Sequence, residues 1–206
     1  MNKPVSVIEP ATAPVARSAT ASELVRGAIQ QKFIMQCCTQ CAAVQYPPRE
    51  ACYQCLSVDL EWSEVENKAQ LLASTLLHSS NEPYFAQRLP WHTGLASSPT
   101  GAAFVCHLLP GCTVGNQVEL SLRFDSAGRA VVVAQPEGEA KDADDSQHPN
   151  AEDFLWGVQG RVVIFDDVDS DRTEAATQLA LASGAVAVIG PDQATGGADE
   201  VMIRLG

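Results

Sequence analysis

Two pairs of cysteines lie close together in the sequence. Cys38 and Cys41 form one Cys-x2-Cys pair, and Cys52 and Cys55 form a second pair after ten intervening residues. This spacing is typical of two short loops that bring four thiolates to one tetrahedral ion. Zinc suits such a site because it accepts four soft ligands and undergoes no redox change. The sequence therefore predicts a zinc ribbon whose ion is structural, since protein ligands fill all four positions.

Other uses of these thiols stay open. Iron in a rubredoxin-like site has the same four ligands, disulfides are disfavoured in a reducing compartment, and a thioredoxin-like redox pair needs a single Cys-x2-Cys in a βαβ setting. Cys37 can compete with Cys38 as a ligand, because Cys37-x3-Cys41 is still within reach. Ala42 and Leu56 stand directly after the two pairs, where glycine is common, which predicts a slightly altered geometry.

The composition restricts location and partners. No apolar run approaches the roughly 20 residues of a membrane helix, and the N-terminal residues lack the apolar stretch of a secretory signal, so we expect a cytoplasmic protein without a membrane partner. The net charge of −12 is uneven, because 15 acidic and 4 basic residues lie from Glu137 to Gly206. Such an acidic region repels phosphates, which argues against a nucleic-acid partner.

Changes in composition and periodicity divide the 206 residues. Leu24, Val25 and Ile29 have helical spacing, with Thr20 or Ser22 as the N-cap. Five short apolar strands follow the cysteines, and a DSAG turn with Gly128 at positive φ precedes the last of them. The predicted segments are a flexible arm (1–19), a helix and zinc ribbon (20–60), an OB-fold barrel (61–136), an acidic linker (137–153) and a βαβ docking module (154–206).

The final segment has the pattern strand, helix, strand. Its strands are expected at Arg161 to Phe165 and at Ala185 to Ile189, and Gly184 is expected to end the helix. The segment resembles the opening unit of a short-chain dehydrogenase, but the turn reads DDVDSD, whose acids repel a pyrophosphate. A unit of this size cannot bury its own faces. We therefore expect it to dock on the barrel or on a partner enzyme.

A larger pattern now combines these features. The chain contains a short helix, the motif C-x2-C-x4-YPPR-x2-C-x2-C, DLEW, and a five-stranded barrel with PYFAQRLPW in its first long loop. This combination resembles the rubredoxin-like zinc ribbon plus OB-fold proteins that accompany thiolases and related acyl-CoA enzymes. The resemblance covers about residues 20–136. It implies a mainly β fold with short helices, and it does not explain the C-terminal segment.

The resemblance also implies a function. It suggests a non-catalytic subunit of a heteromer, for example α2β2, in which a thiolase-fold subunit carries the catalytic residues and cleaves a 3-ketoacyl-CoA in a catabolic, β-oxidation-like step. Thiolysis, acyl transfer and retro-aldol cleavage are all compatible with it, and an aromatic acyl group such as an aroylsuccinyl thioester is one candidate. The sequence contains no nucleophile elbow, glycine-rich phosphate loop or HExxH motif. Two alternatives are a free-standing acyl-CoA-binding module and a single-stranded nucleic-acid binder.

Several side chains are candidates for contact with CoA or a partner. Arginine and lysine suit the CoA phosphates, and aromatic residues suit an acyl group or a partner surface, although solvated charge and core packing are the ordinary roles of both. His92 and His107 are expected to be satisfied barrel residues, and Cys106 and Cys112 to be thiols outside any metal site. The candidates are Arg49, Lys68, Tyr84, Phe85, Arg88 and Trp91, with Arg123 as a further cation.

Overall fold

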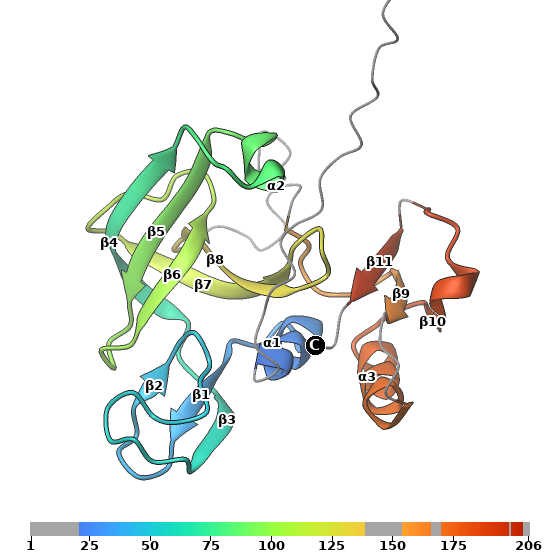
Figure 1. The fold of residues 1–206 in the computed structure, drawn as a ribbon, viewed down its shortest axis with the longest axis horizontal. Coiled ribbons are helices and arrows are strands. Elements are labelled where there is room, and N and C mark those ends of the chain that lie inside the picture. Colours follow the sequence, from blue (N-terminus) through green and yellow to red (C-terminus); the bar gives the residue numbers. More distant parts are fainter. Residues whose placement is uncertain (1–20, 139–153, 166–169, 198, 204–206) are drawn as a thin grey trace, which may run out of the picture.

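A computed structural model describes residues 21–138, 154–165, 170–197 and 199–203, and it has the predicted mainly β fold (Figure 1). The predicted arm and nearly all of the predicted linker lie outside these residues. No helix in the described ranges is long and apolar enough to cross a membrane.

The first helix, α1 (Ser22–Gln30), buries Leu24, Val25 and Ile29 in the same core as the barrel strands. Its N-cap is Ala21, which makes no side-chain cap hydrogen bond, so the predicted cap at Ser22 is wrong and Thr20 lies outside the described residues. Serine is only one of several ways to begin a helix whose stability comes from packing of its apolar face.

The ribbon is a three-stranded antiparallel sheet in the order β2-β1-β3. Its strands are β1 (Ile34–Cys38), β2 (Val44–Gln45) and β3 (Leu60–Glu64). The loops between these strands carry Cys41, Cys52 and Cys55, and Cys38 ends β1. The ribbon therefore consists mainly of loops around a very small sheet.

Five strands close the barrel in the order β4-β5-β6-β8-β7. They are β4 (Lys68–Leu77), β5 (Trp91–Ser97), β6 (Ala103–Leu108), β7 (Gln117–Phe124) and β8 (Ala130–Pro136), with β6 and β8 parallel. This is the predicted OB-fold. The loop before β5 contains the short helix α2 (Pro83–Ala86).

The turn between β7 and β8 forms as predicted. Gly128 has φ of 73°, and the Asp125 carboxylate accepts hydrogen bonds from the backbone N–H groups of Ala127 and Arg129 at 3.0 and 2.9 Å. A side chain at Gly128 would collide with the backbone of Met202. Glycine is therefore required here both for the turn and for the close approach of the C-terminal strand.

The C-terminal segment is a parallel sheet in the order β10-β9-β11. It contains β9 (Val162–Phe165), α3 (Ser170–Ala182), β10 (Ala187–Ile189), the 3-10 turn η4 (Pro191–Gln193) and β11 (Glu200–Ile203). The sequence pattern did not indicate β11. Val163, Phe165, Ala180 and Ile203 lie in one core cluster with residues of α1 and the barrel. The segment thus packs on the protein's own α1 and barrel.

Candidate metal centre and neighbouring pocket

The four predicted cysteines come together in the ribbon. The Sγ atoms of Cys38, Cys41, Cys52 and Cys55 all lie within 4.8 Å of one another, with 3.5 Å between Cys38 and Cys55 and 3.6 Å between Cys41 and Cys52. A tetrahedral zinc with Zn–S bonds of about 2.3 Å places its sulfurs about 3.8 Å apart. The arrangement of the thiols therefore fits zinc.

Each cysteine pair lies in its own loop, and the two loops share the same pattern of backbone hydrogen bonds. In the first, the Cys38 N–H donates to the Ala43 carbonyl at 2.9 Å and the Ala42 N–H donates to the Cys38 carbonyl at 2.9 Å. In the second, the Leu56 N–H donates to the Cys52 carbonyl at 3.0 Å. Ala42 and Leu56 both have a left-handed backbone, with φ of 60° and 62°. Both residues thus adopt the backbone conformation that glycine usually has at this position, and the left-handed conformation costs about 1–2 kcal/mol of stability at each residue.

We expect Leu56→Gly to stabilise the protein by about 0.5–1 kcal/mol, since relief of the left-handed strain exceeds the added entropy of the unfolded chain. Leu56 is 78% exposed, so little packing is lost. The free energy of unfolding of the zinc-loaded protein in urea measures this. Leu56→Ala is the control and should give no gain, because alanine keeps the strain. Equal stability of the glycine and alanine variants would contradict the argument.

The thiols differ in their electrostatics. The pKa of Cys52 is lowered to about 6, chiefly because the backbone N–H groups of Cys55 and Gln54 donate to its sulfur, against the opposing effect of desolvation. The pKa of Cys41 is raised to about 12: the backbone N–H of Ala43 lowers it, but desolvation and hydrogen bonds with the other three thiols outweigh that effect. Four adjacent thiols thus keep some of their protons unless a cation is bound. Zinc supplies the positive charge that allows all four to be thiolates.

The remaining cysteines stand apart from this cluster. Cys37 follows the pleat of β1 to the face opposite Cys38, and its Sγ accepts a hydrogen bond from the Ser63 hydroxyl at 3.0 Å. Cys106 is buried, and burial raises its pKa to about 12. Cys112 contacts the Ala134 carbonyl at 3.5 Å. None of the three belongs to the four-thiol group.

Two buried glutamines, which the sequence did not single out, organise the YPPR loop. The side chain of Gln36 donates to the Arg49 carbonyl at 2.8 Å and accepts from the Arg49 N–H at 2.9 Å. Gln45, its partner in the β1–β2 register, donates to the Gln36 side chain at 2.6 Å and accepts from the Tyr53 N–H at 3.1 Å. A buried glutamine in a strand has no sequence signature. The pair fixes the backbone at the end of the loop and just after it.

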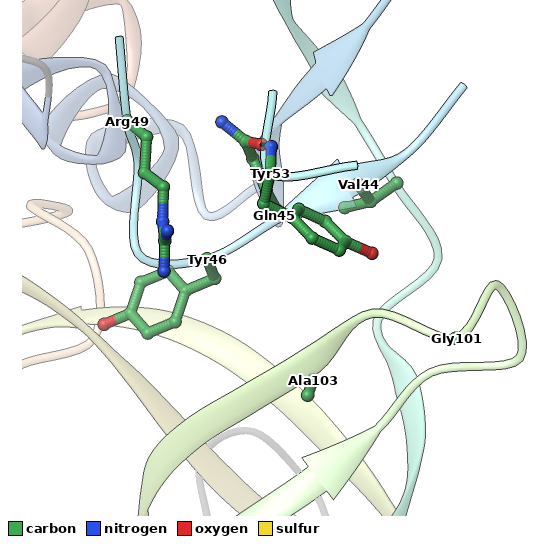
Figure 2. Close-up of a pocket in the computed structure, with 7 residues that line it drawn as sticks. All are labelled: Val44, Gln45, Tyr46, Arg49, Tyr53, Gly101 and Ala103. Atoms are coloured by element: carbon green, nitrogen blue, oxygen red, sulfur yellow. Dashed lines mark hydrogen bonds between the residues drawn. The ribbon is translucent and has the colours of Figure 1, made fainter. Parts of the chain in front are cut away.

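The organised loop forms one wall of a pocket between ribbon and barrel, with a volume of about 480 Å³. Figure 2 shows the Arg49 side chain extending toward the ring of Tyr46, with the β5–β6 turn at Gly101 across the opening. The ring of Tyr46 also lies 6.0 Å from that of Phe104. The lining offers aromatic surface and one exposed cation; it consists of Val44, Gln45, Tyr46, Arg49, Tyr53, Gly101 and Ala103.

The other predicted contact residues lie elsewhere. Tyr84 and Trp91 are each 2% exposed and belong to an aromatic cluster with Phe85, and the guanidinium of Arg88 lies 4.0 Å from the Tyr84 ring. The cluster is mainly core, and Phe85 and Arg88 form its partly exposed side. Lys68 forms an ion pair with Glu137 at 2.6 Å. Only Arg49 among the six candidates lines the pocket.

The prediction that Arg123 is available for a phosphate is wrong. Its side chain is 3% exposed, donates to Gln135 at 2.6 Å and to Ser121 at 3.2 Å, and lies 5.0 Å from the ring of Trp156. Arg123 alternates along β7 with the core residues Leu122 and Phe124, so it lies on the opposite face of the strand. It can be buried there because polar neighbours receive its donors. His107 is a satisfied barrel residue as predicted, accepting a hydrogen bond from the Trp91 indole at 3.0 Å.

Comparison with known proteins supports the ribbon. Residues 26–61 match the family model described as "ChsH2, rubredoxin-like zinc ribbon domain", which confirms for this segment the resemblance predicted from the cysteine motif. A search of curated proteins found no match.

Two solved structures are similar to part of this chain. One, described as "Ltp2-ChsH2(DUF35) aldolase", is 22% identical with a TM-score of 0.49, over 60% of this chain and 98% of that chain. The other is a protein of unknown function from the DUF35 family of Sulfolobus solfataricus, 19% identical with a TM-score of 0.40, over 56% of this chain and 83% of that chain.

Proposed function

We propose that this protein is a non-catalytic, zinc-stabilised OB-fold subunit of a heteromeric thiolase-type complex that cleaves a 3-ketoacyl-CoA. The thiolase-fold partner carries the catalytic residues, and the CoA thioester lies at or near the interface of the two chains. An aromatic acyl group, as in an aroylsuccinyl-CoA, is the first substrate to test. The observation that carries the proposal is a closed four-thiol cluster beside an open pocket lined by two tyrosines and one arginine.

The cluster supports a structural role for the metal. Four thiolates around one zinc leave no open position for water or substrate, and such an ion has no site at which to polarise a carbonyl. The cluster is also made by loops that have little regular structure of their own. Zinc in this protein is therefore expected to hold the ribbon, and with it the YPPR loop, in place.

The pocket supports a role in binding. Arg49 gives the wall a positive charge that suits a phosphate, and Tyr46 and Tyr53 give it flat apolar surface that suits an adenine ring or a pantetheine arm. The seven lining residues include no histidine, carboxylate or cysteine. This chemistry is suited to holding CoA and leaves bond cleavage to another chain.

The alternative function, binding of single-stranded nucleic acid, has less support. An OB-fold that binds single strands combines exposed aromatics with a basic groove. Of the cations considered above, Arg123 is buried and Lys68 is paired with Glu137. The pocket keeps Arg49 alone, which is too little charge to follow a phosphate backbone.

Purification from the native host at endogenous level tests the proposal. Mass spectrometry of the co-eluting proteins should identify a thiolase-fold protein at a stoichiometric ratio, and metal analysis should give one zinc per copy of this chain. A zinc-bound monomer that binds CoA esters without any such partner would replace the proposal by the free-standing acyl-CoA-binding module.

We expect Arg49→Ala to raise the KM of the assembled enzyme for its CoA thioester about tenfold with little change in kcat, because a charge-assisted hydrogen bond contributes about 1.5–3 kcal/mol to binding. Arg49→Lys should recover part of the loss, since it restores the charge without the planar guanidinium. Arg26→Ala on α1, where Arg26 pairs with Glu23 at 2.7 Å, is the control and should leave KM unchanged. An unchanged KM in Arg49→Ala would exclude this arginine from the CoA site.

A further inference from the structure

One side of the barrel exposes large aliphatic side chains. The strand register places Ala73, Leu95 and Val105 side by side on the outward face of β4, β5 and β6. Val105 is 64% exposed, and Leu95 is 36% exposed. Leu72 lies at the register shift of β4, opposite Leu95, and is 49% exposed. Leu77, at the end of β4, is 39% exposed. We name Leu72, Leu77, Leu95 and Val105 the uncharged face.

This face lacks charge to an unusual degree for so acidic a chain. Residues 69–81 and 89–118 contain no Asp, Glu, Lys or Arg, although the whole chain has 25 acidic and 13 basic residues. These two stretches include all of β5 and β6 and all of β4 after Lys68. Aliphatic surface without charges is typical of the centre of a protein interface.

The edge of β4 beside this face is open. β4 pairs with β7 only from Lys68 to Gln70, and the Leu71 backbone bonds to Gly115 and Asn116. From Leu72 to Leu77 every residue is exposed, and in the described part of the chain that stretch has β5 as its only strand neighbour. Monomeric proteins usually protect such an edge with lysine or proline. Neither residue occurs between Leu72 and Leu77.

The uncharged face leads directly to the pocket. Ala103 lies two residues before Val105 in β6, so both side chains point outward, and Ala103 lines the pocket together with Tyr53 of the ribbon. In Figure 1, strands β4, β5 and β6 and the ribbon occupy one side of the molecule, and the C-terminal sheet of β9, β10 and β11 lies on the other side. Any chain that covers this face also borders the mouth of the pocket.

We propose that the uncharged face and the open edge of β4 are where the catalytic subunit docks. This inference rests on the proposed function: a thioester held at the pocket must reach catalytic residues in another chain, so that chain has to border the pocket. A second copy of this protein does not meet that need, because it brings another non-catalytic ribbon. The partner must present an uncharged, aliphatic surface of its own, and the association should depend only weakly on salt concentration.

The test uses the full chain and the thiolase-fold protein that co-purifies with it. We expect Val105→Glu and Val105→Lys each to weaken the affinity at least 100-fold, because either change leaves a buried, unpaired charge in the interface. Val186→Glu is the matched control, since Val186 is 69% exposed but lies in the C-terminal sheet region, and it should change the affinity less than threefold. Zinc content and melting temperature verify that each variant is folded.

A second readout does not depend on a destabilising change. A photo-crosslinking amino acid in place of Val105 should attach to the catalytic subunit, and the same group in place of Val186 should not. Wild-type affinity in both Val105 variants, or no crosslink from position 105, would overturn this inference and leave the proposed function intact. If the wild-type chain captures no thiolase-fold protein, the proposed function is contradicted, and the docking inference that rests on it is contradicted as well. If the chain alone is a dimer that Val105→Glu converts to a monomer, the face joins two copies instead.

Discussion

Cys38→Ser should abolish zinc binding and lower the melting temperature by roughly 10 °C or more, whereas Cys37→Ser, one residue away, should leave both nearly unchanged. Binding of structural zinc contributes about 10–16 kcal/mol in zinc-finger peptides at pH 7, so losing one thiolate of four removes several kcal/mol. The Cys38 side chain is 2% exposed, and its Sγ lies 3.5 Å from that of Cys55 inside the four-thiol cluster. The serine hydroxyl is a poor replacement ligand because it is not ionised at neutral pH.

Cys37→Ser is an unusually close control. Its sulfur lies on the opposite face of β1, where the Ser63 hydroxyl is its neighbour, and serine can make the same hydrogen bond. We expect one zinc per chain and a melting temperature within about 2 °C of wild type. Metal analysis and thermal unfolding measure both quantities. Full zinc content in Cys38→Ser, or loss of zinc in Cys37→Ser, would show that Cys37 is a ligand.

Phe104→Ala should reduce the free energy of unfolding by about 3–5 kcal/mol, the usual cost of deleting a buried phenylalanine ring. Phe104 is fully buried on β6, with its ring 5.5 Å from that of Phe33, which precedes β1, and 6.0 Å from that of Tyr46 in the YPPR loop. The ring therefore joins the barrel to the ribbon. Its loss leaves a cavity at the junction of the two parts.

Urea unfolding of the zinc-loaded protein measures this effect. Val105→Ala, the next residue along β6, is the control and should change the stability by no more than about 0.5 kcal/mol, because Val105 points to solvent in the isolated chain. A loss below about 1 kcal/mol in Phe104→Ala would mean that the barrel and ribbon relax to fill the space, and that the junction is not held by this ring.

The parts of the fold that were predictable depend on local sequence patterns. The cysteine spacing describes two loops of a few residues each, and the five barrel strands and the Gly128 turn are visible as apolar runs and turn residues. The Gln36–Gln45 pair was not predictable, because its meaning depends on strand pairing between positions nine residues apart. β11 was missed for a similar reason: a four-residue strand is held by parallel pairing to β9, far away in the sequence.

Among the candidate site residues, residue type alone did not decide the role. Arg49 and Arg123 have the same side chain and similar formal suitability for phosphate, yet one lines a pocket and the other is buried beside Gln135. Likewise, Trp91 donates its indole N–H to His107 and belongs to the interior. The alternation along β7 places Arg123 on the face opposite the core, but Trp156 packs over that face. A contact between residues so far apart in the sequence is not visible in a local pattern.

The barrel and the C-terminal sheet share one hydrophobic core, so we expect the two parts to unfold as one cooperative unit. Phe124 of β7 exchanges backbone hydrogen bonds with Leu155 at 2.9 and 2.8 Å, and Ile203 of β11 is fully buried in the core cluster that includes Leu122. A substitution that changes the stability of one part is therefore expected to change the stability of the other part as well. A substitution at Ile203, the last described residue, should lower the population of folded barrel as effectively as one inside the barrel itself.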